Sequence, residues 1–302
     1  MRQSRPAIYL TSETHHSFVK VARMTGLGTD ALREIPTDSR LMMDIDALQS
    51  RIDADRVSGW HPLMIVGTAG TTSAGIVDPL EKLAEVATEH GIWFHVDAAW
   101  GGSAVLSPRL KGGVAGIERA DSITWDAHKW LSVPMGAGMF FCRHPEAIKR
   151  AFAITASYMP NAIADDTVDP YATIAQWSRR AIGFKVFMAL AELGTSGYGE
   201  LIEYQAQMGD YLRERLHQLG WEVVNETTLP VICFTHPDIQ QGLLSTSEIL
   251  QTMYERGHVW ISDVVLGKQE RVLRVCITSF HTNESDIECL LEEIEYARQR
   301  NL

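Results

Sequence analysis

Short apolar runs alternate with amphipathic segments along the first half of the chain, up to about Arg143. Residues 7–10 (AIYL), 62–70 (PLMIVGTAG) and 92–100 (IWFHVDAAW) have the length and the β-branched or aromatic content of buried strands. Helical patterns separate these runs. A strand–helix alternation of this kind predicts an α/β fold with a mostly parallel sheet.

Residues 78–91 are one of the helical segments. Their apolar side chains fall at positions 80, 83, 84 and 87, which lie on one face of a helix. Asp78 is the expected N-cap, Pro79 suits the first turn, and Gly91 is the expected end. In the same way, Asp44 is the expected N-cap of a preceding helix.

The pattern changes in the middle of the chain. Residues 156–173 are rich in Pro, Asn and Asp, and the segment is long enough to be a functional loop. Long helices are expected at Ile174–Leu193 and Gly199–Leu219, followed by shorter strands and helices. We expect residues 1–190 to belong to a large domain and residues 191–302 to form a smaller C-terminal α+β domain.

Charge and cysteine content narrow the choice of partners. The chain has 27 basic and 38 acidic residues and a formal net charge of −11, which repels phosphate backbones and anionic lipids. Neither nucleic acid nor a membrane is therefore an expected partner, and no apolar stretch approaches the roughly 20 residues that span a bilayer. The four cysteines are scattered without a CxxC motif, which indicates reduced thiols and a cytoplasmic location.

Three of the expected strands end in residues that can do chemistry. The first strand ends in residues 70–72 (Gly-Thr-Thr), the second in residues 97–99 (Asp-Ala-Ala), and the third in residues 126–129 (Asp-Ala-His-Lys). Each alone is readily explained as a strand end that has reached solvent. Ligands of open α/β sheets bind at the carboxyl ends of strands, however, so three such ends at one edge favour a ligand site.

One combination suits pyridoxal 5'-phosphate. That cofactor needs a lysine amine for a Schiff base and a carboxylate on its pyridine nitrogen. Lys129 and Asp97 are the candidates, and their separation of 32 residues fits two strands joined by one crossover. Ala98 and Ala99 are small enough to let a flat ring lie close.

A metal site would compete for the same residues. His95 and Asp97 share one face of a strand, and Asp126 and His128 form a similar pair, which makes four candidate nitrogen or oxygen ligands. No HExxH motif or cluster of carboxylates accompanies them. We therefore expect no metal.

The same segments carry a family resemblance. Residues 95–102 (HVDAAWGG) and 120–130 (ADSITWDAHKW) resemble the group II pyridoxal-phosphate-dependent amino acid decarboxylases, which include the glutamate, aromatic-L-amino-acid, cysteine sulfinate and diaminobutyrate decarboxylases. The likeness continues through residues 11–22 (TSETHHSFVKVA), 67–80 (GTAGTTSAGIVDPL) and 273–287 (LRVCITSFHTNESDI). It implies the PLP-dependent transferase-like fold (fold type I), with pyridoxal 5'-phosphate (PLP) as cofactor.

The resemblance also implies roles for individual residues. Lys129 matches the Schiff-base lysine, and Asp97 matches the partner of the pyridine nitrogen. Ala99 matches the alanine that packs on one face of the ring. His16, rather than His15, is expected to match the histidine that stacks on the opposite face and takes part in catalysis.

Other matches concern the substrate and the phosphate. Thr72 matches a threonine near the phenolic oxygen of the cofactor and the substrate carboxylate, and His128 matches a histidine near the phosphate. Tyr171 lies in the segment that corresponds to the catalytic loop, and Arg274 matches an arginine that contacts the substrate carboxylate. Asp126 stands where several members carry a phosphate-binding Asn, and its role is left open.

The implied reaction is decarboxylation of an L-amino acid to an amine and CO2. Family members have a further N-terminal stretch and act as homodimers, so we expect this chain to be a truncated or split piece that works as a homodimer or with a complementary N-terminal chain. Two alternatives remain open. One is another carbon–carbon lyase or aldehyde-forming reaction at the same site, and the other is an inactive fragment that binds a partner.

Overall fold

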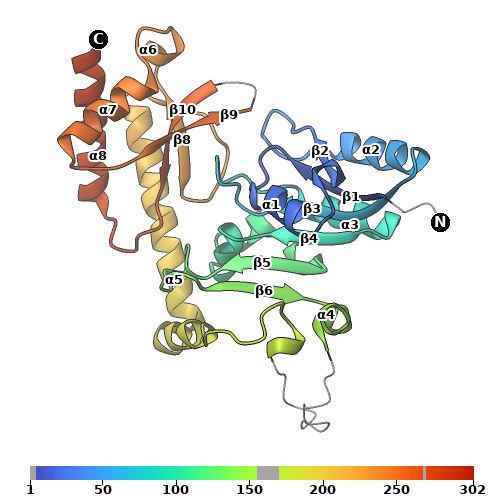
Figure 1. The fold of residues 1–302 in the computed structure, drawn as a ribbon. Coiled ribbons are helices and arrows are strands. Elements are labelled where there is room, and N and C mark those ends of the chain that lie inside the picture. Colours follow the sequence, from blue (N-terminus) through green and yellow to red (C-terminus); the bar gives the residue numbers. More distant parts are fainter. Residues whose placement is uncertain (1–4, 155–169, 268–269) are drawn as a thin grey trace.

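The computed structural model describes residues 5–154, 170–267 and 270–302. These residues form a six-stranded sheet with the order β2-β1-β3-β4-β5-β6 and a separate four-stranded sheet with the order β7-β8-β10-β9 (Figure 1). The larger sheet contains β1 (Arg5–Thr11), β2 (Leu32–Ile35), β3 (Trp60–Thr68), β4 (Trp93–Asp97), β5 (Ser122–Asp126) and β6 (Gly138–Cys142). Its first five strands are parallel and β6 is antiparallel to β5, which confirms the predicted α/β fold with a mostly parallel sheet.

Helices connect the parallel strands. The connections contain α1 (Ser17–Met24), α2 (Ile45–Val57), α3 (Leu80–His90) and the short 3-10 helices η1 (Thr29–Ala31), η2 (Gly101–Leu106), η3 (Lys111–Val114) and η4 (Ile117–Arg119). The helix α4 (Pro145–Phe152) and the 3-10 helix η5 (Pro170–Ala172) follow β6. The Asp44 carboxylate accepts a hydrogen bond from the N–H of Ala47 and so caps α2, as expected. Gly91 ends α3 in the left-handed conformation, also as expected.

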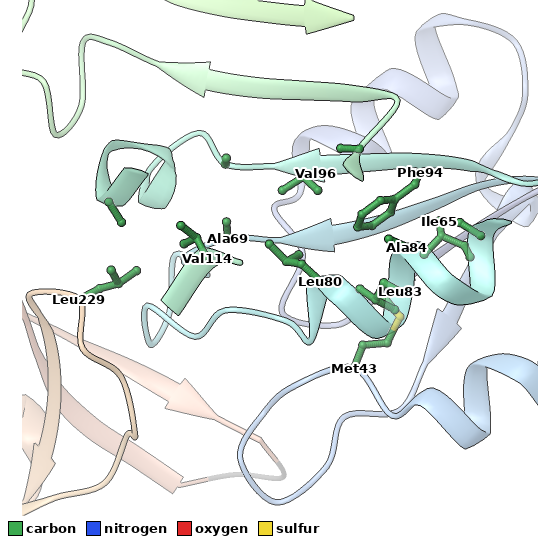
Figure 2. Packing of buried hydrophobic residues seen from close by; sticks show 14 of the residues in the cluster. Met43, Ile65, Ala69, Leu80, Leu83, Ala84, Phe94, Val96, Val114 and Leu229 are labelled. Atoms are coloured by element: carbon green, nitrogen blue, oxygen red, sulfur yellow. The ribbon is translucent and has the colours of Figure 1, made fainter. Parts of the chain in front are cut away.

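The main core lies between α3 and the sheet. Figure 2 shows Leu80 and Leu83 of α3 facing the buried side chains of the sheet, among them Ile65 and Phe94. All four are almost fully buried. Leu229, from far along the chain, completes this core, which shows that the C-terminal part packs against the larger sheet. Truncating a buried leucine to alanine typically costs about 2–5 kcal/mol, so each of these contacts matters for stability.

The C-terminal part is an antiparallel sheet with helices packed around it. Its elements are α5 (Gly183–Gln218), β7 (Glu222–Val223), β8 (Val231–Thr235), α6 (Pro237–Gln240), α7 (Thr246–Arg256), β9 (Ser262–Leu266), β10 (Glu270–Cys276) and α8 (Glu284–Asn301). Capping boxes begin α7, through Ser245 and Glu248, and α8, through Asn283 and Asp286. The long helix α5 extends from beside the larger sheet to the smaller one (Figure 1).

Two expectations about helices are wrong in detail. Residues 174–182 are not helical, and α5 begins only at Gly183. The two long helices that were expected are one helix with a kink at Gly194, where φ is 63° and ψ is 177°. Glycine tolerates this conformation, so the helix axis can break there without a loop. The predicted domain boundary at residue 190 falls inside α5, just before this kink, and it stays a prediction.

Asp78 does not cap α3, contrary to expectation. The N-cap position is Pro79, and no side chain caps the helix there. The Asp78 carboxylate instead accepts hydrogen bonds of 2.8 Å from the N–H groups of Met43 and Thr68. The side chain is buried, and this burial raises the pKa of Asp78 to about 6. Asp78 therefore ties the loop before α2 to the end of β3.

Candidate active site

The carboxyl ends of β3, β4 and β5 meet at one edge of the larger sheet. A small pocket lies there, with about 270 Å³ of empty space, part of it open to solvent. It is lined by His15, Thr68, Gly70, Thr72, Asp97, Ala99, Trp100 and Lys129. Four of the residues predicted from the sequence are therefore brought together: Thr72, Asp97, Ala99 and Lys129.

Asp97 is the last residue of β4, a strand in the middle of the sheet. Its side chain is buried, and its Oδ1 accepts a 3.1 Å hydrogen bond from the N–H of Ala99. His95 lies two residues earlier, with its Nδ1 2.8 Å from Ser122 Oγ. Burial lowers the pKa of His95 against the opposing effect of Asp97, which favours a neutral imidazole. The buried aspartate thus has a backbone donor but no neighbouring cation on its own strand.

Lys129 lies in the turn that follows β5. Its Nζ is 3.1 Å from Oδ2 of Asp126, the last residue of that strand. The turn is closed by a 3.1 Å hydrogen bond from the Lys129 N–H to the Asp126 carbonyl. His128 Nε2 lies 3.9 Å from the same carboxylate oxygen, and its Nδ1 is buried without a hydrogen-bond partner among the described residues. His128 does not line the pocket that Lys129 lines.

The turn after β3 packs closely against η2. Gly70 has a φ of 90°, and the N–H of Gly101 donates a 3.0 Å hydrogen bond to the carbonyl of Ala69. A side chain on Gly101 would collide with the carbonyl group of Ala69. This contact draws the start of η2 toward the turn that leads to Thr72, and so helps to shape the pocket.

Two lining residues went unnoticed in the sequence as site residues: Thr68 and Trp100. Thr68 ends β3 as Asp97 ends β4, so the strand-end argument would have found it. Its buried Oγ1 has no hydrogen-bond partner in the part of the chain that the structure describes. The Trp100 ring stacks on Trp130, with the ring centres 4.6 Å apart and the planes 9° apart. No local sequence signal reveals that stack.

The histidine at the pocket is His15, whereas His16 was expected. His16 occupies the N-cap position of α1 and is not a lining residue. His15 precedes the helix, and its Nδ1 lies 2.9 Å from Ser17 Oγ. Side chains of adjacent residues at a helix start point in different directions, so the pocket can take only one of the pair. The choice depends on where α1 begins.

Arg274 reaches the same region from the smaller sheet. It lies in β10, and its Nε donates a 3.0 Å hydrogen bond to the carbonyl of Ser73, the neighbour of Thr72. The Ser73 hydroxyl donates to the Glu13 carboxylate, and the Cys233 thiol lies 3.4 Å from the Ser73 carbonyl. Arg274 is therefore bound to the turn beside the pocket, but it does not line the pocket itself.

Tyr171 is not among the residues that line the pocket. It belongs to η5, and its ring centre is 5.2 Å from that of Trp177. Residues 155–169, the greater part of the expected loop, fall outside the described residues. Within the described ranges, no group of three or more His, Cys, Asp or Glu side chains could hold a metal ion.

The pocket chemistry fits PLP. A buried carboxylate and a primary amine stand at neighbouring strand ends, Ala99 leaves room for a flat ring, and the Thr68 hydroxyl is an unused polar group at the wall. These are the groups that would hold the pyridine nitrogen, the reactive carbon and an oxygen of the cofactor. A mostly parallel sheet with such a site at its carboxyl edge defines a PLP-dependent protein of fold type I.

Comparison with known proteins identifies the family. The profile of the pyridoxal-dependent decarboxylase conserved domain matches residues 2–236, and the chain belongs to that family. Cysteine sulfinic acid decarboxylase of Mus musculus is 31% identical over 97% of this chain and 63% of its own length.

Solved structures agree with this assignment. The crystal structure of mouse CSAD has a TM-score of 0.90 at 29% identity, covering 98% of this chain and 64% of the other. Rhodiola rosea 4-hydroxyphenylacetaldehyde synthase has a TM-score of 0.87 at 27% identity, covering 98% and 62%. The chain therefore spans about 60% of the length of the relatives that it matches.

Proposed function

We propose that this chain carries the cofactor-binding part of an amino acid decarboxylase, which converts an L-amino acid to an amine and CO2. The observation that carries the proposal is that Asp97 and Lys129 line one pocket together with Thr72 and Ala99. The family profile and the similarity to a cysteine sulfinic acid decarboxylase support the reaction class.

When bound, PLP supplies an electron sink for the pair left as the bond between Cα and the carboxylate breaks. In our proposal the Asp97 carboxylate keeps a proton on the pyridine nitrogen, and its burial strengthens that charge interaction. The Lys129 amine attaches the cofactor, and Ala99 leaves space on one ring face. The Thr72 hydroxyl donates a hydrogen bond to an oxygen of the cofactor or substrate.

The remaining roles are proposed with one change. His15 takes the place first given to His16 on the second ring face, because His15 is the lining residue. His128 contributes its free Nδ1 to the phosphate. Tyr171 supplies a proton to Cα, and Arg274 binds the substrate carboxylate through the part of its guanidinium that is not bonded to Ser73.

The assembly and location are also proposals. We propose two parts, residues 1–190 and 191–302, that function in the cytoplasm as a homodimer or with a complementary N-terminal chain. Exposed apolar side chains support a partner surface: Phe184 and Phe187 on α5 and Phe140 and Phe141 on β6. No helix in the described ranges is long and apolar enough to cross a membrane.

The first test is attachment of the cofactor. The chain is incubated with PLP, reduced with borohydride, digested and examined by mass spectrometry. We expect one pyridoxyl adduct, on Lys129, which is lost in Lys129→Ala and retained in the matched control Lys111→Ala. A protein that stays unmodified at Lys129 would contradict the proposal.

The second test identifies the products. The chain, in the longest form that its gene encodes, is offered cysteine sulfinate, glutamate and aromatic amino acids, and amine and CO2 are measured. Equal amounts of amine and CO2 support decarboxylation. Aldehyde and ammonia in place of the amine would instead support the aldehyde-forming alternative. The structural similarity to 4-hydroxyphenylacetaldehyde synthase is the reason to test for that alternative.

A further inference from the structure

The lysine of the pocket already has a partner of opposite charge. Lys129 Nζ lies 3.1 Å from Asp126 Oδ2, and both side chains are partly buried, with 34% and 19% of their surface exposed. The two residues are three positions apart in one tight turn, which a backbone hydrogen bond between them closes. The backbone of the turn therefore fixes the positions of the two residues relative to each other, and this favours the contact between their side chains.

The charged groups around this pair are few. His128 Nε2 is 3.9 Å from the same Asp126 oxygen, and Asp97 and His15 line the pocket with Lys129. The acidic groups that face the lysine are the carboxylates of Asp126 and Asp97. Asp126 is the one within hydrogen-bond distance.

An ammonium group has no lone pair and cannot attack a carbonyl carbon. A lysine nitrogen paired with a carboxylate must also leave that contact before it can meet a carbonyl carbon, and water screens a partly buried pair less than an exposed one. An asparagine at the same position would keep the shape of the side chain and remove this effect. The choice of Asp at position 126 thus bears directly on how reactive Lys129 is.

We propose that Asp126 is a positioning residue that holds Nζ of Lys129 in an ion pair in the cofactor-free pocket and so restrains its reaction with electrophiles. The importance of Lys129 as the cofactor-binding residue rests on the proposed function. The ion pair between Lys129 and Asp126 does not rest on that function, so it can be tested without PLP and without a substrate.

The test measures acetylation of lysines in the cofactor-free chain. A limiting amount of the N-hydroxysuccinimide ester of acetic acid is added at pH 8. The neutral amine attacks the acyl carbon, an amide bond forms, N-hydroxysuccinimide leaves, and the proton lost from nitrogen goes to the buffer. Peptide mass spectrometry gives the rate at Lys129 relative to the exposed Lys111 in the same molecule.

We expect Asp126→Asn to raise the relative rate at Lys129 by about threefold or more. The matched control is Glu146→Gln, which removes another acid three residues before its lysine. That pair, Glu146 and Lys149, is 3.5 Å apart and mostly exposed. Because water screens it, the rate at Lys149 should change less than about twofold.

A Lys129 rate that stays unchanged or falls in folded Asp126→Asn overturns the inference. Circular dichroism checks the fold, and Asp126→Ser, which also lacks the charge, replaces the Asn variant if that variant does not fold. Failure here leaves the cofactor proposal standing, because a pyridoxyl adduct on Lys129 does not require the ion pair. Conversely, absence of that adduct would leave the ion pair untouched.

Discussion

His15 and His16 are neighbours with different environments. His15 lines the pocket, and His16 stands at the start of α1. Both side chains are exposed, so neither is needed for the core. At the scale of single residues, what matters for the site is which side chain the backbone directs to the end of the sheet. The same holds for Asp97, which its strand directs into the pocket while the Ala99 N–H holds its carboxylate.

This difference predicts an asymmetric pair of variants. His15→Ala should lower the rate of the proposed decarboxylation by about 100-fold, the scale of a lost acid–base group. His16→Ala should change it less than about threefold. Rates of amine formation check both, with urea unfolding to show that the two variants are equally stable. Equal losses in the two variants would refute the assignment of His15.

At the scale of elements, the pocket depends on close contact between the turn after β3 and η2. Gly101 donates its N–H to the Ala69 carbonyl, and no side chain fits at that position. Asp78 supports the same region by binding the N–H of Thr68 at the end of β3. The site is thus held by backbone contacts, whose geometry side-chain rearrangement cannot restore.

A methyl group at Gly101 is therefore expected to destabilise the fold. In Gly101→Ala the new Cβ would lie 2.8 Å from the carbonyl carbon of Ala69, so the backbone must shift. We expect a loss of about 1–3 kcal/mol in the free energy of unfolding, the usual cost of overpacking. Gly112→Ala is the control, because nothing lies within 4 Å of its added Cβ. Denaturant unfolding that finds the two variants equally stable would show that the contact is unimportant.

At the scale of the whole molecule, the smaller sheet is joined to the larger one through the turn that follows Thr72. Arg274 and Cys233 contact the Ser73 carbonyl, and the hydroxyl of Thr227 donates to the carbonyl of Gly75. Buried Asn225 donates to the Ala74 carbonyl at 2.7 Å and accepts from the Cys233 N–H at 2.8 Å. Movement of one sheet against the other would therefore disturb the pocket wall.

Among the residues that join the two sheets, Asn225 is the one whose replacement should lower the stability of the fold most. Asn225→Ala removes the partners of two buried backbone groups, the carbonyl of Ala74 and the N–H of Cys233, and should lower the free energy of unfolding by about 2–4 kcal/mol. The control is Gln240→Ala, which removes an exposed hydrogen bond to Glu222 and should cost less than about 0.5 kcal/mol. Thermal unfolding followed by circular dichroism measures both variants. Similar unfolding midpoints for the two would contradict the expected contribution of Asn225 to the contact between the sheets.

Local patterns in the sequence were enough for much of the fold. The order of strands and helices, the cap at Asp44 and the end of α3 at Gly91 all follow from side-chain periodicity and backbone preference, which act over a few residues. The strand-end rule also led to Asp97 and Lys129, because parallel strands bring their carboxyl ends together whatever their exact lengths.

The sequence by itself thus determined the class of fold and the central pair of the pocket. Only the tertiary structure decided that His15 rather than His16 lines the pocket, that Asp78 binds Met43 and Thr68 instead of capping a helix, and that Arg274 is tied to Ser73. These outcomes depend on where helices begin and how distant segments pack. Such contacts join residues tens to hundreds of positions apart, and no short-range periodicity encodes them.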